Sequence, residues 1–239
     1  MTETAQNNCI NCSQTGSGHY CSNCGNEYYV HRITVGHILH EVIHLLTHFD
    51  KGILYTLKQL LLRPGFMQHD YLAGKRVKHQ KPFAMFFVCG TLTALALYWI
   101  NIAVAKLYHD NNLYEGHFYQ HYFALMQMSL TPAYALTMWA IFSKRYNYAE
   151  YLVIILYSTS MLLLFVFFAN LLKLVFGPFE TGYVELLVVL AYNIITNINL
   201  FNDRPRVGII LLTLLSSVIC FAMSRGAMLV FIRFFMPHS

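Results

Sequence analysis

Long apolar stretches fill the chain after Pro82 and carry almost no charge. They lie at about 83–105, 122–142, 150–176, 184–201 and 207–223, the last of them ending there or as late as Phe235. About 20 residues of helix cross a hydrocarbon layer that is about 30 Å thick, and each stretch approaches or exceeds this length. The strict alternation that a membrane barrel needs is missing. The pattern therefore predicts an all-α integral membrane protein with about five transmembrane helices over residues 83–235.

Shorter amphipathic segments precede the first apolar stretch. Residues 34–49 repeat apolar side chains at steps of three and four, which is the period of a helix. A second such segment covers residues 52–62, and the Arg63-Pro64-Gly65 that follows is a strong turn signal. Residues 66–72 predict a further short helix. We therefore expect amphipathic juxtamembrane helices over residues 33–81, interrupted by a Pro-Gly break and lying at the membrane surface.

The composition strengthens the membrane assignment. Of 239 residues, 56% are hydrophobic and only 11% are charged, whereas soluble domains carry about 25% charged residues. No apolar segment precedes residue 83, so we expect no signal peptide. Residues 1–8 are polar and predict a disordered tail. The expected protein is a small polar head followed by a membrane domain.

Basic residues gather on one side of the predicted spans. A basic run comes just before the first span, and the second and fourth loops carry Lys144, Arg145, Arg204 and Arg206. Short loops rich in Lys and Arg face the cytoplasm, so we expect a multi-pass protein of the cell (inner) membrane with a cytoplasmic N-terminus. The juxtamembrane cations either bind anionic lipid head groups or only fix the topology. Both interpretations stay open for Arg63, Lys75, Arg76, Lys78 and Lys81.

Four of the six cysteines are clustered near the N-terminus. They form two C-x2-C pairs, Cys9 with Cys12 and Cys21 with Cys24. Such a pair places two thiolates on one tight turn, and two pairs supply the tetrahedral sulfur set of a structural Zn²⁺. An iron–sulfur site and unmetallated thiols are the alternatives. The spacing predicts a zinc ribbon over residues 9–28, whose closed ligand set holds structure and performs no chemistry.

The ribbon lacks the charge of a nucleic-acid-binding domain. No Lys or Arg lies between Cys9 and Cys24, although neutralisation of phosphates drives the affinity of proteins for nucleic acids. We therefore expect no nucleic-acid partner. The expected partners are the lipid bilayer and other membrane or cytoplasmic proteins.

The first amphipathic segment contains a motif of zinc enzymes. Residues 40–44 have the H-E-x-x-H spacing, which on a helix brings two histidines to one metal and adds a glutamate base. A membrane-bound zinc metallopeptidase would use His40, Glu41 and His44. The downstream extension that supplies a third ligand is missing, and the His-rich polar face of an interfacial helix explains the same letters. We therefore favour a protein that is not an enzyme and assign no catalytic residue.

The order of these features resembles an uncharacterised bacterial family of multi-pass membrane proteins with an N-terminal zinc ribbon, known only as a domain of unknown function. The resemblance covers residues 9–82 and rests on the two cysteine pairs, Asp50-Lys51-Gly52, Arg63-Pro64-Gly65 and Gly74-Lys75-Arg76. It implies that the four clustered cysteines are metal ligands, and it implies no activity. The H-E-x-x-H letters are not part of the family pattern.

The fourth span carries a polar stripe formed by Asn193, Thr196, Asn197 and Asn199. Amide groups within a bilayer need partners, which are commonly other helices and less often a water-filled path. Three functions follow from the sequence. We favour a scaffold, accessory or interaction subunit with a structural cytoplasmic zinc ribbon. The alternatives are the metallopeptidase and a small-solute or lipid permease that uses the polar stripe.

Overall fold

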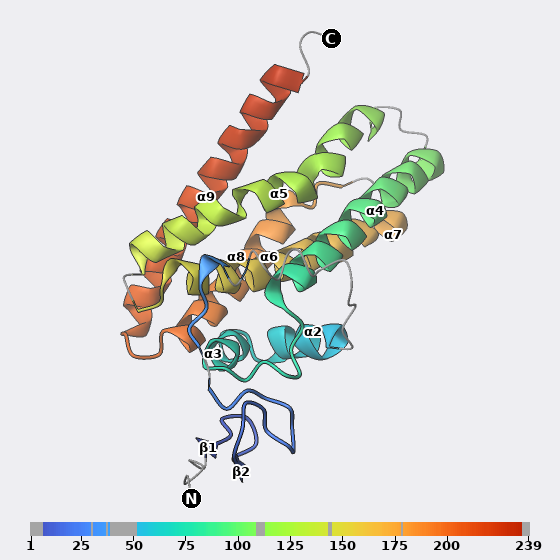
Figure 1. The fold of residues 1–239 in the computed structure, drawn as a ribbon. Helices are drawn as coiled ribbons and strands as arrows, with labels where there is room; N and C mark the ends of the chain where they lie inside the picture. Colours follow the sequence, from blue (N-terminus) through green and yellow to red (C-terminus); the bar gives the residue numbers. More distant parts are fainter. Residues whose placement is uncertain are drawn as a thin grey trace, which may run out of the picture.

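The computed structural model describes residues 7–29, 31–36, 38, 52–108, 113–142, 145–177 and 179–235. Over these residues a two-stranded hairpin is followed by helices only, which confirms an all-α membrane protein with a small head (Figure 1). The elements are β1 (Asn7–Asn8), β2 (Thr15–Gly16), α2 (Ile53–Leu62), α3 (Phe66–Leu72), α4 (Pro82–Tyr108), α5 (Leu113–Ile141), α6 (Tyr148–Leu171), α7 (Lys173–Phe176), α8 (Gly182–Leu200) and α9 (Arg206–Phe235).

Within the described residues, four helical segments are long and apolar enough to cross a membrane. They are Pro82–Tyr108, Tyr148–Phe176, Gly182–Leu200 and Arg206–Val230. The second of the five expected spans, residues 122–142, lies mostly inside α5. This helix has 29 residues, but it is less apolar than the others because it contains polar side chains such as Gln127 and a proline, Pro132. Helix α9, which contains the last expected span, continues to Phe235, and its segment Arg206–Val230 is the one long and apolar enough to cross a membrane.

Helix α6 lies at the centre of the bundle. It packs against α4, α5 and α8, and also against α2 and α3. Half of the residues in its most apolar stretch are buried, whereas only 17% are buried in the most apolar stretch of α9. Helix α9 packs on α5 and α8 at the outside of the bundle. The start of α6 is fixed by a capping box. The Asn147 side chain accepts from the Glu150 N–H, and the Glu150 carboxylate accepts from the Asn147 N–H, both at 2.8 Å.

The residues of α2, α3 and the loop after them form a platform (residues 52–81) at one end of the bundle (Figure 1). Its two helices coincide with the amphipathic segments expected from the sequence. Leu60, Met67 and Tyr71 are buried in one cluster with side chains of α4, α6 and α8. The hydrophobic effect therefore holds the platform against the bundle and leaves its outer face exposed.

The Pro-Gly break of the platform is fitted to the end of α8. The Asn199 side chain donates to the Pro64 carbonyl at 2.7 Å. Gly65 has a φ of +83°, and a Cβ there would overlap the Thr196 carbonyl oxygen. Only glycine combines this backbone conformation with so close an approach. The turn signal in the sequence thus marks a docking point between elements that are far apart in the chain.

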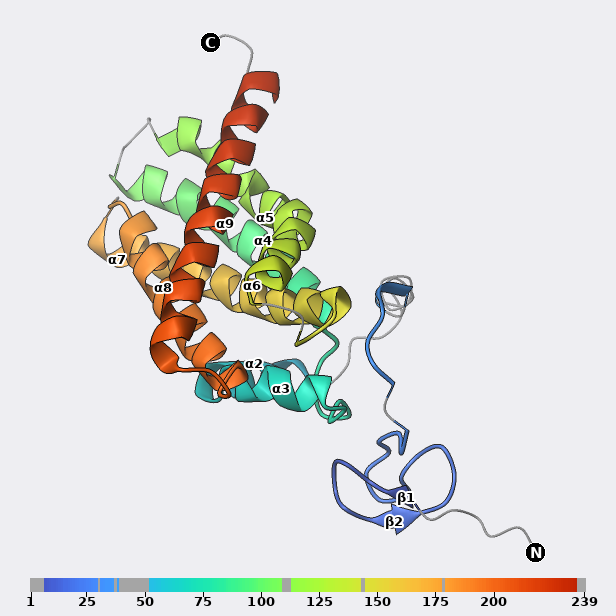
Figure 2. The same ribbon diagram turned by 90° about the vertical axis from the view of Figure 1, so that its left-hand side faces the viewer.

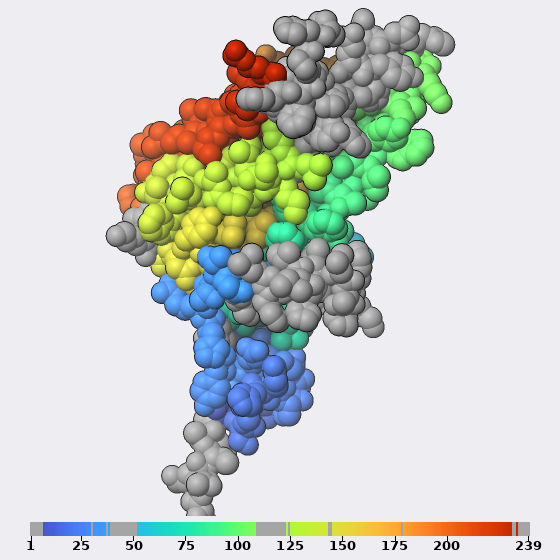
Figure 3. Space-filling view, turned by 45° about the horizontal axis from the view of Figure 1, so that its top comes forward, coloured from blue at the N-terminus to red at the C-terminus, as the bar shows by residue number. Residues whose placement is uncertain are grey.

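The head (residues 7–29) lies beyond α2 and α3 and forms one end of the molecule (Figures 2 and 3). Asn7 and Asn8, the last two residues of the expected tail, are paired with Gly16 and Thr15, and the rest of that tail lies outside the described residues. Residues 31–36 connect the head to the bundle and are called the strap below. Most of the amphipathic segment 34–49 lies outside the described residues.

Candidate metal centre

The four clustered cysteines come together in space. All four Sγ atoms lie within 4.8 Å of one another, and two of the separations, Cys9 to Cys24 and Cys12 to Cys21, are 3.6 Å. A tetrahedron with metal–sulfur bonds of about 2.3 Å has edges of about 3.8 Å. A disulfide would need a separation of about 2.05 Å, and all four cysteines are free. The sulfur atoms therefore have the spacing of a four-coordinate metal site.

The two cysteine pairs sit on turns of the same backbone geometry. In each turn the residue after the second cysteine donates its N–H to the carbonyl of the first cysteine, Ser13 to Cys9 and Gly25 to Cys21, both at 2.8 Å. Ser13 and Gly25 both have positive φ, +61° and +75°. An antiparallel pair flanks each turn, Asn8 with Thr15 and Tyr20 with Glu27. The head is thus built from two similar halves, each of which supplies two sulfur atoms.

Hydrogen bonds within the head favour the thiolate form of two cysteines. A hydrogen bond from the backbone of Cys24 lowers the pKa of the Cys21 thiol to about 6. The side chain of Asn11 hydrogen-bonds to Cys24 and lowers the pKa of its thiol as well. Thiolates, and not thiols, are the metal ligands. These hydrogen bonds therefore favour the metal-binding form of Cys21 and Cys24.

One aromatic side chain completes the small core of the head. Tyr28 is buried against Cys9 and Cys21. Burial, together with the neighbouring Cys21, raises the pKa of the Tyr28 hydroxyl to about 12, so this group stays protonated and neutral. A core of this size cannot stabilise a domain by burial alone. The metal site must supply most of the folding free energy of the head.

The strap ties the head to the start of α6. The Arg32 guanidinium makes two hydrogen bonds of 3.1 Å to the Glu150 carboxylate. The Asn147 side chain donates to the Ile33 carbonyl at 3.0 Å, and Ile33 itself is buried. Arg76 of the platform donates to the His31 carbonyl at 3.3 Å. Sequence reasoning missed this anchor, because Arg32 and Glu150 are 118 positions apart and no motif links the two.

All five predicted lipid-binding cations lie on the platform, where three of them contact other residues of the protein. Lys75 lies 3.0 Å from the Asp70 carboxylate, and Arg63 lies 4.0 Å from it. Arg76 donates to the Tyr71 carbonyl at 3.2 Å and stacks over the Tyr71 ring. Lys78 and Lys81 form no ion pair with any residue that the structure describes. Lipid binding by this set stays a prediction, and it depends chiefly on these last two lysines.

The polar stripe of the fourth span is divided among different environments. Asn197 is buried and donates to the Thr213 hydroxyl of α9 at 3.1 Å. The Asn199 side chain donates to the Pro64 carbonyl of the platform. Asn193 lines a cavity between helices. The stripe is therefore not a continuous path. The other sequence motif, His40-Glu41-Val42-Ile43-His44, lies outside the described residues.

Comparisons with known proteins agree with the region that the sequence singled out. The model of a family described as "Protein of unknown function (DUF3667)" matches residues 50–94. No curated protein and no solved structure matches the chain. The matched residues include Gly52, where a Cβ would lie 2.9 Å from the Lys78 carbonyl oxygen, and Gly65 at the docking turn. The chain is thus similar over its platform and the start of α4 to a family of unknown function, and its four-cysteine head fits an uncharacterised family with a metal-binding head.

Proposed function

We propose that this protein is an integral membrane scaffold or accessory subunit of the bacterial inner membrane, and that its head is a cytoplasmic zinc ribbon that binds partner proteins. The observation that carries the proposal is the closed cluster of four thiolates. Four sulfur ligands fill the tetrahedral positions of Zn²⁺ and leave no open position for a substrate. The metal therefore stabilises a surface, and that surface is the functional part of the head.

The distribution of charge supports a cytoplasmic head. The platform, which carries basic residues, lies at the head end of the bundle (Figure 1), and Arg145 lies beside Arg32 and Glu150. Arg145 pairs with Asp203, which brings the loops before α6 and before α9 to the same end. Loops rich in Lys and Arg stay on the cytoplasmic side. The head then faces the cytoplasm, where thiols stay reduced and available to a metal.

The surface of the head supports a protein partner. Ile10, Tyr20 and Tyr29 are 45%, 64% and 55% exposed, and exposed aromatic side chains are typical of protein interfaces. Zn²⁺ bound by four thiolates carries two negative charges, and Glu27 adds another, whereas residues 7–29 contain no Lys or Arg. Such a head is repelled by anionic lipid head groups and by nucleic acids. The remaining class of partner is a protein.

The metal is tested by elemental analysis of the full-length protein in detergent. We expect one zinc per chain, lost in Cys21→Ser and kept in Ser22→Ala, which changes an exposed non-ligand residue of the same turn. Another metal, or none, would contradict the zinc ribbon. A second zinc that disappears in His44→Ala would favour the metallopeptidase instead.

The partner is tested by cross-linking in intact cells, with the full-length protein in its own membrane. We expect defined cross-linked proteins for the wild type and for Gln14→Ala, which alters an exposed polar residue of the head. The yield should fall at least tenfold in the double variant Tyr20→Ser/Tyr29→Ser and in Cys21→Ser. An unchanged set of cross-linked proteins in both variants would contradict the proposed role of the head.

A further inference from the structure

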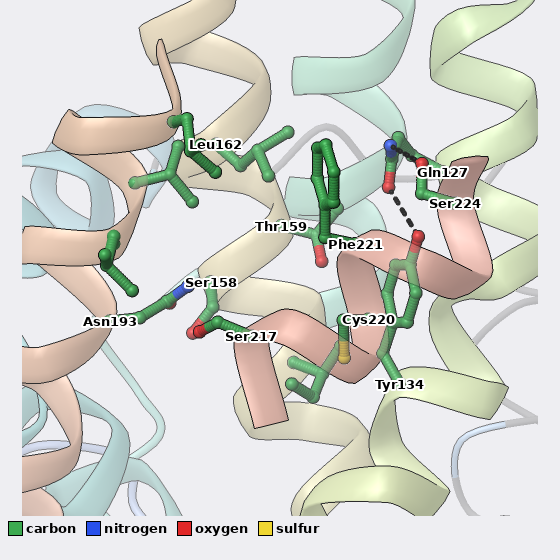
Figure 4. A pocket seen from close by; sticks show the side chains of 14 residues that line it. Gln127, Tyr134, Ser158, Thr159, Leu162, Asn193, Ser217, Cys220, Phe221 and Ser224 are labelled. Atoms are coloured by element: carbon green, nitrogen blue, oxygen red, sulfur yellow. Dashed lines mark hydrogen bonds between the residues drawn. The ribbon is translucent and has the colours of Figure 1, made fainter. Parts of the chain in front are cut away.

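The membrane bundle contains a cavity of about 180 Å³ between α5, α6, α8 and α9 (Figure 4). Helices α6, α8 and α9 contribute both polar and apolar side chains to its wall, and α5 contributes Gln127 and Tyr134. No charged side chain is among the lining residues. The polar lining residues fall into two groups, which differ in how their hydrogen bonds are satisfied.

The first group satisfies its own hydrogen bonds. The Tyr134 hydroxyl donates to the Gln127 side-chain oxygen at 3.2 Å, and the Gln127 amide donates to the Ser224 hydroxyl at 3.4 Å (Figure 4). These residues tie α5 to α9. Interhelical polar contacts of this kind are common in membrane bundles and need no ligand.

The second group does not satisfy its own hydrogen bonds. The side chains of Ser158, Asn193 and Ser217 point toward one another from α6, α8 and α9 (Figure 4). Thr159 lines the same cavity and is only 6% exposed. None of these four side chains makes a hydrogen bond to any residue that the structure describes. Two hydroxyls and one amide therefore converge on a space where they have no protein partner, and the Thr159 side chain lines the same cavity.

Hydroxyl and amide groups without hydrogen-bond partners cost free energy within a bilayer, because no bulk water is present there to bond with them. With a helix rise of 1.5 Å per residue, Asn193 lies about 10 Å and Ser217 about 16 Å from the head-side ends of their helices. The group is thus well inside the hydrocarbon layer. A polar ligand is the natural partner, and the absence of lining charges restricts it to an uncharged one with hydroxyl or carbonyl oxygen atoms.

The mouth of the cavity is apolar. Leu186 of α8 and Phe221 of α9 line it and are 46% and 52% exposed, so they form its rim. Both lie within segments long and apolar enough to span a membrane. A molecule that enters between α8 and α9 therefore comes from the lipid phase. Entry from the hydrocarbon layer selects a ligand with an acyl or prenyl chain.

We propose that this cavity binds the small uncharged head of a neutral lipid, with Ser158, Thr159, Asn193 and Ser217 as its hydrogen-bonding residues. Both glycerol hydroxyls and quinone carbonyls have the required chemistry. The site is independent of the zinc ribbon and of the scaffold role, so its failure would leave both intact.

The test uses the full-length protein in three kinds of phosphatidylcholine nanodisc. One contains 5 mol% dioleoylglycerol, one contains 5 mol% of a prenylated benzoquinone, and one contains neither. Native mass spectrometry after release counts the retained lipid. We expect one equivalent of at least one of the two neutral lipids on the wild type and on Ser216→Ala. The double variant Asn193→Ala/Ser217→Ala should retain at least fivefold less. Ser216 is the matched control because it neighbours Ser217 but donates to the Thr213 carbonyl and does not line the cavity.

A second readout uses Cys220, which lines the same cavity. Its alkylation by N-ethylmaleimide is followed by peptide mass spectrometry, which separates it from the other cysteines. The retained lipid should slow alkylation at least fivefold in the wild type and in Ser216→Ala, and not in the double variant. Retention of neither lipid, or equal retention by wild type and double variant, would overturn the proposal. Protection of Cys220 by dissolved glycerol when neither lipid is retained would also overturn it.

Discussion

The head and the platform are both small units next to the membrane, yet different forces hold them together. The buried core of the head consists of two cysteines and one tyrosine around the sulfur cluster. The platform has no metal-ligand cluster within its described residues, and its apolar side chains are buried against the bundle. The head should therefore respond to metal and be indifferent to the bundle, whereas the platform should respond to the bundle and be indifferent to metal.

Removal of the metal should produce the largest effect. Binding of structural zinc by small peptides contributes about 10–16 kcal/mol of apparent free energy, which exceeds what the core of the head can supply. Chelation, or Cys21→Ser, should unfold residues 7–29 and leave the helices intact. Limited proteolysis should then cut the head, while the helical signal in circular dichroism stays unchanged. A head that resists proteolysis without metal would remove the contrast between the two units.

Gly65→Ala should act on the platform and not on the head. The new Cβ would lie 2.6 Å from the Asn199 Cβ at a φ of +83°, and the combined strain and overlap should cost about 3 kcal/mol. The midpoint of thermal unfolding of the helices in detergent should fall, with the zinc content unchanged. Gly226→Ala is the control, because its Cβ meets open space on α9 and should be neutral or slightly stabilising.

Arg32→Gln should have a smaller effect, because it loosens the strap that joins the head to the bundle. The Arg32 side chain is 69% exposed and the Glu150 side chain only 6%, so solvent screens the ion pair in part and its loss should cost about 1 kcal/mol, the upper end of the range for surface pairs. Hydrogen exchange over residues 31–36 should become faster, and added salt should reduce the difference from the wild type. Lys75→Gln removes an ion pair within the platform and should leave exchange in the strap unchanged.

The smallest effect should be a dependence of platform stability on pH through His79. Burial lowers the pKa of His79, although Asp70 acts in the opposite direction. The unfolded chain binds this proton near pH 6.5, so the stabilisation is complete above that pH and is lost as the pH falls toward the folded pKa. The unfolding midpoint of the helices should decrease between pH 7 and pH 5. His79→Phe should weaken this dependence, and His19→Gln on the head should not.

Local patterns predicted those parts of the fold whose causes are local. The expected short helix over 66–72 coincides with α3, because the Pro-Gly turn and Gly74 bracket it. The cysteine spacing identified the metal cluster because each C-x2-C pair forms a single local turn. The anchor between Arg32 and Glu150 and the cavity around Ser158 and Ser217 could not be predicted. Their residues are single polar positions with no pattern around them in the sequence, and they come into contact only when distant helices pack together.

The fit between Gly65 and the end of α8 bears on how the protein is made. Pro64 meets Asn199, which lies 135 positions later in the chain. At translation rates of about 10 residues per second, more than about ten seconds separate the synthesis of the two. During this interval α2 and α3 have left the ribosome without their final contact, and their apolar faces can rest on the bilayer surface. The platform is therefore completed only after α8 has been inserted.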